Sequence, residues 1–236
     1  MSGEVHGLGE FYASVAGQAT ARLLRARLAT LWPQLRGRAV LGIGHSAPYL
    51  SLWQEDAARC VALSPPQLGS ARRPAENIGT IVTGEEDRLP FPDLSFDRVL
   101  LVHGLEAAES ARRLLRDVWR VLKDDGKLLV VAPNRRGVWA HFEHTPFGHG
   151  EPYSPGQITR LLARHMFRVE RREAALFVPP IGWMLRRGQG WDQAGRMLCP
   201  EHFAGLVLAE AAKDVFAVIP AGGVQAQRQV LADEPA

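Results

Sequence analysis

Residues 97–132 read DRVLLVHGLEAAESARRLLRDVWRVLKDDGKLLVVA, and this stretch decides the fold class. An unbroken apolar run near its start predicts a buried strand over 97–103. A helix is predicted over 107–123, because apolar residues return at helical spacing on one face. These buried positions are Leu114, Leu115, Val118, Val121 and Leu122. Asp125-Gly126 turns the chain into a second apolar run over 127–132. Two apolar strands separated by a helix predict a parallel sheet that is covered on both faces.

The same alternation extends toward the N-terminus. Short apolar runs at 39–44, 59–63 and 80–83 predict three further strands, and a stripe at helical spacing predicts an N-terminal helix over 10–32. Right-handed crossovers between such strands give a doubly wound α/β domain. Ligands of these domains bind at the carboxyl ends of the strands, near the switch in strand order.

The composition indicates one globular domain. The chain has 236 residues, of which 46% are apolar, and we expect a single domain over 1–220 with a disordered tail over 221–236. No apolar run reaches the length of a membrane span. The N-terminus, Met1-Ser2-Gly3-Glu4, does not have the pattern of a signal segment. These features predict a cytoplasmic protein.

The charged and metal-ligand residues form no recognisable nucleic-acid or metal site. The net charge is +3 and no run of basic residues is longer than two, which argues against nucleic acid as a partner. Cys60 and Cys199 fit no disulfide or metal framework. His141, His144 and His149 share one loop, but their spacing matches no known metal site, so no metal is expected.

Two motifs carry a resemblance to a known family. Residues 89–99, LPFPDLSFDRV, resemble the "LPFPDxSFDxV" segment of class I methyltransferases of the UbiE-like, type 11 group. Residues 121–128, VLKDDGKL, resemble that group's "VLKPGGxL" turn, and Pro133-Asn134-Arg135 resembles the "PNR" that often follows. The spacing of the first two motifs also fits, and the resemblance covers about 10–215. It implies a Rossmann-like methyltransferase fold with strand order 3-2-1-4-5-7-6, strand seven antiparallel, and S-adenosylmethionine as the cofactor.

The resemblance also assigns the end of the chain. Residues 204–211 have the propensity of a helix, but the last strand of this family often ends in a Glu-Ala-x-Lys pattern, which 210–213 match. We therefore predict strand seven over 204–212 and strand six over about 167–177. Residues 179–200 are then an insertion between these strands, close to where the family places its substrate lid.

The glycine turn after the first strand departs from the family pattern. The "D-x-G-x-G-x-G" motif appears here as Gly42-Ile43-Gly44-His45-Ser46-Ala47-Pro48. Gly44 keeps the first glycine, Ser46 and Pro48 replace the next two, and Gly42 stands where an acid usually begins the motif. A glycine lets the backbone approach a ligand closely, so the resemblance implies that Gly42, Gly44, His45 and Ser46 bind the cofactor.

The other cofactor contacts are partly lost. The family's "D-x-S-P" appears as Ala62-Leu63-Ser64-Pro65, so the carboxylate that binds the ribose is absent, and Leu63 and Ser64 are left to hold it. Glu85 lies where the family carries the acid that meets the adenine, and either Glu85 or its neighbour Glu86 is expected to make this contact. The alternative is that Glu85 belongs to a solvated acidic loop. Tyr12 lies where the family's N-terminal helix often carries an aromatic residue over the methionine end, and its alternative is a core tyrosine.

Catalysis leaves a weaker sequence signal. Methyl transfer depends mainly on alignment, and a base is needed only for a weakly acidic nucleophile. No catalytic residue is therefore assigned. His103 ends the strand at 97–103 on the pocket side and is either a base, a residue that lines the cofactor site or a packed histidine.

Two functions from different classes remain open. The first is an S-adenosylmethionine-dependent methyltransferase that acts on a small-molecule or protein acceptor. The second is a methyltransferase-like domain that has lost cofactor binding and serves as a scaffold for a partner protein or an oligomer. The altered glycine turn favours the second, whereas the intact 89–99 segment and Glu85 favour the first. A nicotinamide site is disfavoured, because it requires the missing acid and a fuller glycine set.

Overall fold

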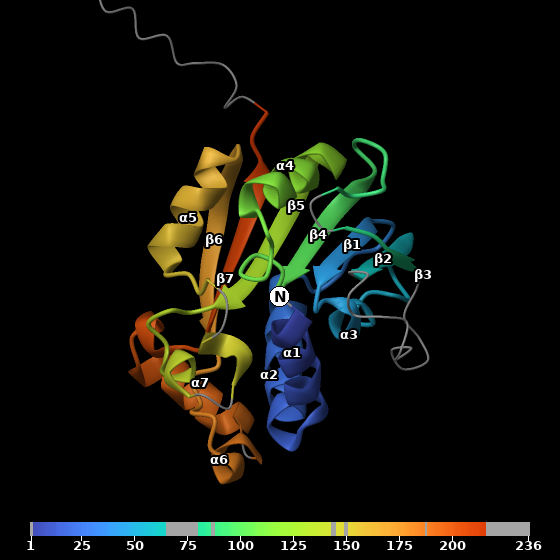
Figure 1. Ribbon diagram of the computed structural model, residues 1–236. Helices are drawn as coiled ribbons and strands as arrows, with labels where there is room; N and C mark the ends of the chain where they lie inside the picture. The colour runs from blue at the N-terminus through green and yellow to red at the C-terminus, as the bar shows by residue number, and fades with distance from the viewer. Residues whose placement is uncertain are drawn as a thin grey trace, which may run out of the picture.

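Seven strands form one sheet whose order, β3-β2-β1-β4-β5-β7-β6, confirms the predicted topology (Figure 1). The computed structural model describes residues 2–64, 80–85, 88–142, 145–148, 151–186 and 188–215. The strands are β1 (Ala39–Gly44), β2 (Arg59–Ser64), β3 (Thr80–Thr83), β4 (Phe96–Val102), β5 (Leu122–Pro133), β6 (Phe167–Ala175) and β7 (Leu206–Lys213). All neighbours pair in parallel except β7, which is antiparallel to both β5 and β6.

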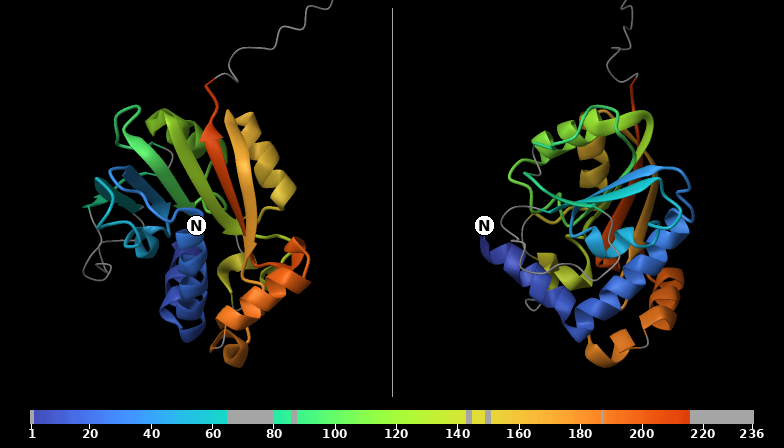
Figure 2. Two further views of the ribbon diagram at one scale, coloured as in Figure 1. Left: turned by 180° about the vertical axis from the view of Figure 1, so that it is seen from behind. Right: turned by 90° about the vertical axis from the view of Figure 1, so that its right-hand side faces the viewer.

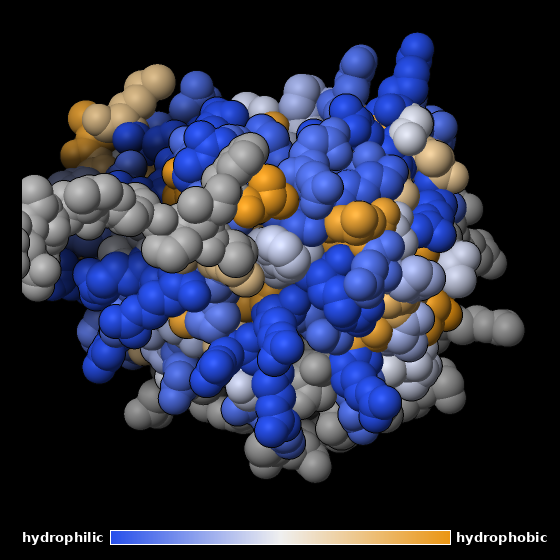
Figure 3. All heavy atoms as spheres, turned by 90° about the horizontal axis from the view of Figure 1, so that it is seen from above, coloured by the Kyte–Doolittle hydropathy of each residue, from blue (hydrophilic) through white to orange (hydrophobic). Residues whose placement is uncertain are grey.

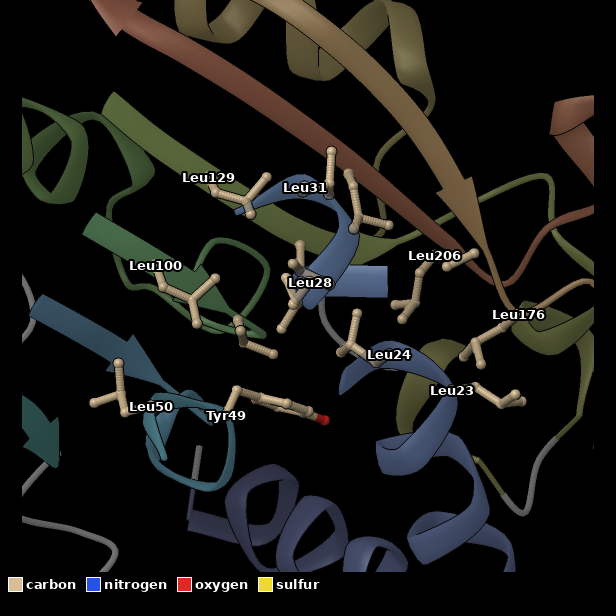
Figure 4. Close-up of a cluster of buried hydrophobic side chains, with 14 of the residues drawn as sticks. Leu23, Leu24, Leu28, Leu31, Tyr49, Leu50, Leu100, Leu129, Leu176 and Leu206 are labelled. Atoms are coloured by element: carbon tan, nitrogen blue, oxygen red, sulfur yellow. The ribbon is translucent and has the colours of Figure 1, made fainter. Parts of the chain in front are cut away.

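Helices cover both faces of this sheet. The α-helices are α1 (Ser2–Ala13), α2 (Val15–Leu31), α3 (Ala47–Leu50), α4 (Ala111–Val121), α5 (Pro155–Arg164), α6 (Gly182–Arg186) and α7 (Gly188–Leu198). Short 3-10 helices are η2 (Val138–His141), η3 (Pro146–Gly148) and η4 (Glu201–Phe203). On one face, Leu24 and Leu28 of α2 pack with Leu100 and Leu129 of the sheet (Figure 4). On the other face, α4 and α5 pack against the remaining apolar side chains of the same strands.

The predicted N-terminal helix over 10–32 is wrong in one respect, because the chain forms two helices there. Ser14 caps α2, and its hydroxyl accepts a hydrogen bond from the Gly17 N–H at 3.1 Å. A Cβ atom at Gly17 would lie 2.0 Å from the Phe11 carbonyl oxygen, so only glycine allows this close return of the chain. The break turns α1 back toward the strand ends and brings Tyr12 to the site described below.

The predicted end of the chain is confirmed, since residues 206–213 form β7 rather than a helix. Pairing with two strands outweighs the local helix propensity. Two polar residues fix the strand: Glu210 Oε1 accepts from Trp32 Nε1 at 3.0 Å, and Lys213 Nζ donates to the Leu122 carbonyl at 2.9 Å. Residues 221–236, the expected tail, lie outside the described residues.

Asp97 links the start of β4 to the start of β1 through hydrogen bonds of its side chain. Its carboxylate accepts from the Ala39 N–H at 2.8 Å and from Lys123 Nζ at 3.1 Å, and it pairs with Arg38 at 3.2 Å. Burial alone would raise the pKa of Asp97, but these hydrogen bonds and the two cations hold it below its usual value. The charged carboxylate therefore stabilises the fold.

The two ends of the sheet differ in what lies over them. Figure 2 shows α1, α2, α6 and α7 together beyond the carboxyl ends of the parallel strands. The opposite end has mainly hydrophilic side chains and scattered hydrophobic ones (Figure 3). Within the described part of the chain, every helix is too short or too polar to cross a bilayer. These four helices thus lie over the edge of the sheet at which such folds bind ligands.

Candidate functional site

The ends of β1, β4 and β5 meet at Gly44. Gly44 has φ +70°, and a Cβ atom there would lie 2.3 Å from the Val102 carbonyl oxygen, so the turn requires glycine. The His45 N–H donates to the same carbonyl at 2.7 Å, and the His103 N–H donates to the Val131 carbonyl at 3.1 Å. The glycine turn is therefore fixed directly against the end of β4.

Gly42 and Ser46 compensate for each other. A Cβ atom at Gly42 would lie 2.3 Å from Ser46 Oγ, and Ser46 is fully buried. The Ser46 side chain fills the space next to Gly42. The side chain of the acid that the family carries at this position would need the same space. The two departures from the glycine motif are thus sterically linked, and the turn keeps its shape.

Tyr12 covers this turn from α1. Its ring stacks on the His45 ring, with the ring centres 4.2 Å apart and an angle of 22° between the planes. Its hydroxyl lies 2.9 Å from His103 Nε2. The structure therefore brings together Tyr12, Gly44, His45 and His103, which are four of the residues predicted from the sequence.

Glu106 was not predicted, although it completes the cluster. Its Oε1 lies 2.7 Å from His103 Nδ1, and the side chains of His103 and Glu106 are only 3% and 7% exposed. A carboxylate accepts hydrogen bonds, so His103 carries its proton on Nδ1 and accepts from the Tyr12 hydroxyl on Nε2. The only feature of the sequence that pointed to this pairing is an acidic residue three positions after His103.

Four buried polar atoms around this turn have no hydrogen-bond partner among the described residues. They are His45 Nε2, Ser46 Oγ, Tyr49 Oη and Glu106 Oε2. An unsatisfied buried polar group costs about 1–3 kcal/mol, and native proteins contain few of them. A polar molecule bound at this turn would give these atoms partners.

Burial sets the protonation of the site. Burial, together with a smaller contribution from nearby His103, lowers the pKa of His45 from 6.5 to about 3, so His45 is neutral. Burial raises the pKa of Tyr12, and the neighbouring Tyr49 adds to this shift. Burial also raises the pKa of Tyr49. Both phenols therefore remain protonated at neutral pH.

The remaining predicted residues lie along the neighbouring strands. Ala62 is 2% exposed and pairs with Gly42 across β1 and β2, and Leu63 packs into the core on the other face. Glu85 is exposed and follows β3 directly, two strands away from the glycine turn. The side chain of Ser64 and the whole of Glu86 lie outside what the structure describes.

The segment over 179–200 forms α6 and α7 between β6 and β7. It carries exposed apolar side chains, with Trp183 64%, Trp191 47%, Met197 77% and Leu198 82% exposed. A groove of about 610 Å³ separates α6 from the start of α2. Its lining comprises Ser14, Val15, Ala16, Ala19, Arg22, Trp183 and Leu185.

The strand order and the glycine turn at the end of β1 define a class I methyltransferase fold. Residues 40–130 match the model of the methyltransferase domain family. A ubiquinone/menaquinone biosynthesis C-methyltransferase, UbiE of Enterobacter sp. (strain 638), is 33% identical over 107 residues. This match covers 41% of the chain and 43% of that protein.

Two solved structures have the same fold over most of the chain. One protein, assigned as a methyltransferase and solved in complex with the Trm112 methyltransferase activator of Haloferax volcanii, has a TM-score of 0.61 and 20% identity. The match covers 87% of this chain and 98% of that one. An S-adenosylmethionine-dependent methyltransferase of Thermotoga maritima has a TM-score of 0.61 and 18% identity, with 87% and 94% covered.

These likenesses confirm the resemblance found in the sequence. The chain is similar to class I S-adenosylmethionine-dependent methyltransferases of the UbiE-like, type 11 group, and it spans less than half of the length of the curated relatives that it matches. S-adenosylmethionine is the cofactor of that family.

Proposed function

We propose that this protein binds S-adenosylmethionine and transfers its methyl group to a small or medium-sized acceptor. The observation that carries the proposal is the group of unpartnered polar atoms on His45, Tyr49 and Glu106, which surround an intact Gly44 turn. A polar ligand at this turn would satisfy groups that are otherwise costly to bury.

The residues present fit the methionine end of the cofactor. The Gly44 turn packs closely against the backbone of Val102 and Gly104, which holds His45 at the end of the strand. The Tyr12 ring stacks on the His45 ring and covers the turn from α1. When bound, the cofactor supplies an activated methyl group, and these residues hold and orient it.

The ribose and adenine ends are held more weakly. The backbone near Leu63 and the Ser64 hydroxyl take over from the missing carboxylate, and Glu85 or Glu86 meets the adenine. A lost charge-assisted hydrogen bond costs about 1.5–3 kcal/mol, which is about a ten- to hundredfold loss of affinity. We expect measurable but weak binding. The Glu85→Ala variant should bind several-fold more weakly, and unchanged affinity would remove this role.

Two glycine variants test the site. Gly44→Ala introduces a Cβ atom that clashes with the Val102 carbonyl, whereas Gly37→Ala has the same strained backbone, φ +69°, but meets no atom within 4 Å. Gly37 lies before β1, at the opposite end of that strand. Calorimetric titration with S-adenosylmethionine should show binding by the wild type and by Gly37→Ala, and none by Gly44→Ala.

The scaffold hypothesis has its own supporting observation. Ala62 and Gly42 are adjacent in the sheet and both lack the acids of the family pattern. The exposed Trp183 and Trp191 on the α6–α7 segment would then contact a partner protein or a second copy. No heat with millimolar S-adenosylmethionine, from the wild type or from Gly37→Ala, would favour this function.

A further inference from the structure

Helix α7 buries small and polar residues and exposes apolar ones. Gly188 and Asp192 are buried and Gly195 is half-buried. At the end of the same helix, Met197 and Leu198 are 77% and 82% exposed. A surface helix normally buries its apolar residues and exposes its polar ones. The exposed part of α7 is therefore suited to an apolar environment.

Asp192 holds α7 in this orientation. Its carboxylate accepts a hydrogen bond from the Phe177 N–H at 2.8 Å and pairs with Arg196 at 2.9 Å, and its side chain is only 7% exposed. A Cβ atom at Gly195 would lie 2.5 Å from Phe177 Cβ, so the helix packs directly on the segment that follows β6. A buried ion pair and a close helix contact thus determine which side chains of α7 reach the surface.

Most of the exposed apolar side chains gather around this helix. Among the described residues, nine large apolar side chains are exposed, and seven of them lie within 181–203 or at the start of α2. Figure 2 shows α2, α6 and α7 together at one end of the molecule. Such a concentration of exposed apolar side chains marks a contact site. The α6–α7 surface comprises Ile181, Trp183, Trp191, Met197, Leu198 and Phe203.

The two tryptophans of the α6–α7 surface differ from the other four in the chain. Each of the other four donates an indole N–H hydrogen bond within the protein, and these are Trp32, Trp53, Trp119 and Trp139. The N–H groups of Trp183 and Trp191 have no acceptor among the described residues, and the two rings meet edge-on at 6.4 Å. An apolar ring with a free N–H suits the boundary between lipid chains and hydrated headgroups.

Positive charge flanks the α6–α7 surface on two sides. Arg22 of α2 lines the same groove as Trp183. Arg135-Arg136 is exposed beside η4, because Asn134 Nδ2 donates to the Ala204 carbonyl at 2.8 Å. These three arginines have no printed acid beside them to neutralise their charge, so they are available to an anionic partner.

Negative charge is scarce at the same place. The described acids within 181–203 are Asp192, which is buried and paired with Arg196, and Glu201, which is exposed. Protruding apolar side chains, tryptophans with free N–H groups and flanking arginines are the features of proteins that lie on anionic bilayers. A protein partner would not require this combination.

We propose that the α6–α7 surface binds an anionic lipid bilayer. Met197 and Leu198 enter the acyl region, Trp183 and Trp191 lie at the level of the headgroups, and the flanking arginines contact lipid phosphates. The carboxyl ends of the parallel strands then face the bilayer. This inference goes beyond the proposed function and does not depend on cofactor binding.

The test uses the full chain with vesicles of phosphatidylglycerol and, separately, of phosphatidylcholine. The protein should sediment with the anionic vesicles at low salt, sediment little with the neutral ones, and be released by high salt, which screens the arginines. Vesicles with brominated acyl chains should quench part of the tryptophan fluorescence. The double variant Trp183→Phe/Trp191→Phe should still sediment but lose this quenching, because the remaining tryptophans are buried or half-buried.

Matched variants separate the apolar contact from the charge. Leu198→Asn should weaken vesicle binding about tenfold, because a leucine no longer enters the bilayer. Leu94→Asn is the control: Leu94 is 47% exposed before β4, at the opposite end of the sheet, and its removal should change nothing.

The charge is tested by Arg135→Gln/Arg136→Gln. An arginine near an anionic surface contributes about a fivefold gain in affinity, so this double variant should bind about 25-fold more weakly. The control is Arg112→Gln/Arg116→Gln on α4, which lies away from the α6–α7 surface (Figure 1) and should bind as the wild type.

Three results would overturn the proposal. The first is no sedimentation with phosphatidylglycerol vesicles at low salt. The second is equal binding by Leu198→Asn and Leu94→Asn. The third is a dimer that Leu198→Asn abolishes and that does not bind vesicles, which would show that a second copy covers this surface. None of these measurements contains S-adenosylmethionine, so their failure leaves the proposed methyl transfer untouched, and absence of heat with S-adenosylmethionine leaves bilayer binding untouched.

Discussion

Replacing Ala62 with aspartate introduces a carboxylate at the position where the family pattern carries the acid that binds the ribose. Ala62 is 2% exposed, lies on β2 and pairs with Gly42 of β1. Gly42 has no side chain, and the unpartnered Ser46 hydroxyl lies beside it. The Ser46 side chain fills the space beside Gly42, so a carboxylate introduced at Ala62 must displace this side chain or accept a hydrogen bond from its hydroxyl.

Two opposing energies can be worked out from this position. A charge-assisted hydrogen bond from a ribose hydroxyl contributes about 1.5–3 kcal/mol, so the affinity for S-adenosylmethionine should rise about ten- to hundredfold. Without the ligand, an unpaired buried carboxylate destabilises the fold by a few kcal/mol. Burial raises the pKa of such a group, so this destabilisation is present at neutral pH and decreases as the pH falls and the carboxyl group is protonated.

Calorimetry of wild type, Ala62→Asp and Ala62→Asn decides the matter. The asparagine variant has nearly the same shape without the charge, and its gain should be less than tenfold, because a neutral hydrogen bond contributes only about 0.5–1.5 kcal/mol. Competition with adenosine and with 2′-deoxyadenosine locates the contact, since a ribose contact should favour adenosine more strongly in Ala62→Asp. Equal affinity of wild type and a folded Ala62→Asp for S-adenosylmethionine would refute the assignment of this position.

Three further predictions follow from the same contacts. Deleting residues 1–14 removes α1 and Tyr12, and should lower the affinity for S-adenosylmethionine while circular dichroism shows an intact sheet; a truncated chain that binds as well as the full chain would remove this role. Asp97→Ala should lower the free energy of unfolding in urea by about 1–3 kcal/mol, because it leaves the buried Ala39 N–H without its partner; an unchanged free energy of unfolding would contradict the anchoring role. The pKa of His45 is lowered from 6.5 to about 3, so the wild type should lose about 2 kcal/mol of stability between pH 7 and 5, as the unfolded state takes up a proton, and His45→Asn should lose less; equal pH dependence would show that His45 is not buried in its neutral form.

The order of the sheet could be predicted from the sequence because its information is local and redundant. The apolar runs of β4 and β5 each mark a buried strand, and the helix between them fixes their parallel pairing. The strand at 206–213 could not be predicted from propensity, because its alanines and leucines favour a helix, and only the family pattern identified it. Pairing with β5 and β6 explains why that pattern prevailed.

The site was predictable only in part, because its contacts depend on backbone geometry. The helical stripe continues across Ser14, so the break that positions Tyr12 had only a Ser-x-x-Gly cap as its signal. The pairing of His103 with Glu106 depends on the left-handed backbone of His103, which spacing alone does not indicate. The compensation between Gly42 and Ser46 likewise appears only when the turn is seen in three dimensions.

A substitution of Tyr49 can distinguish a site that binds a ligand from one that has lost ligand binding. Its ring lies in the core between α3 and α2 (Figure 4), it is fully buried, and its hydroxyl has no partner among the described residues. In a domain that no longer binds a ligand, the hydroxyl is only a cost, so Tyr49→Phe should raise the free energy of unfolding by about 1–3 kcal/mol and change nothing else. If the hydroxyl contacts a ligand, the same variant should be more stable and should also bind S-adenosylmethionine several-fold more weakly. Urea unfolding and calorimetry on one preparation measure both quantities. A stabilised Tyr49→Phe with undiminished affinity would place its hydroxyl outside the binding site.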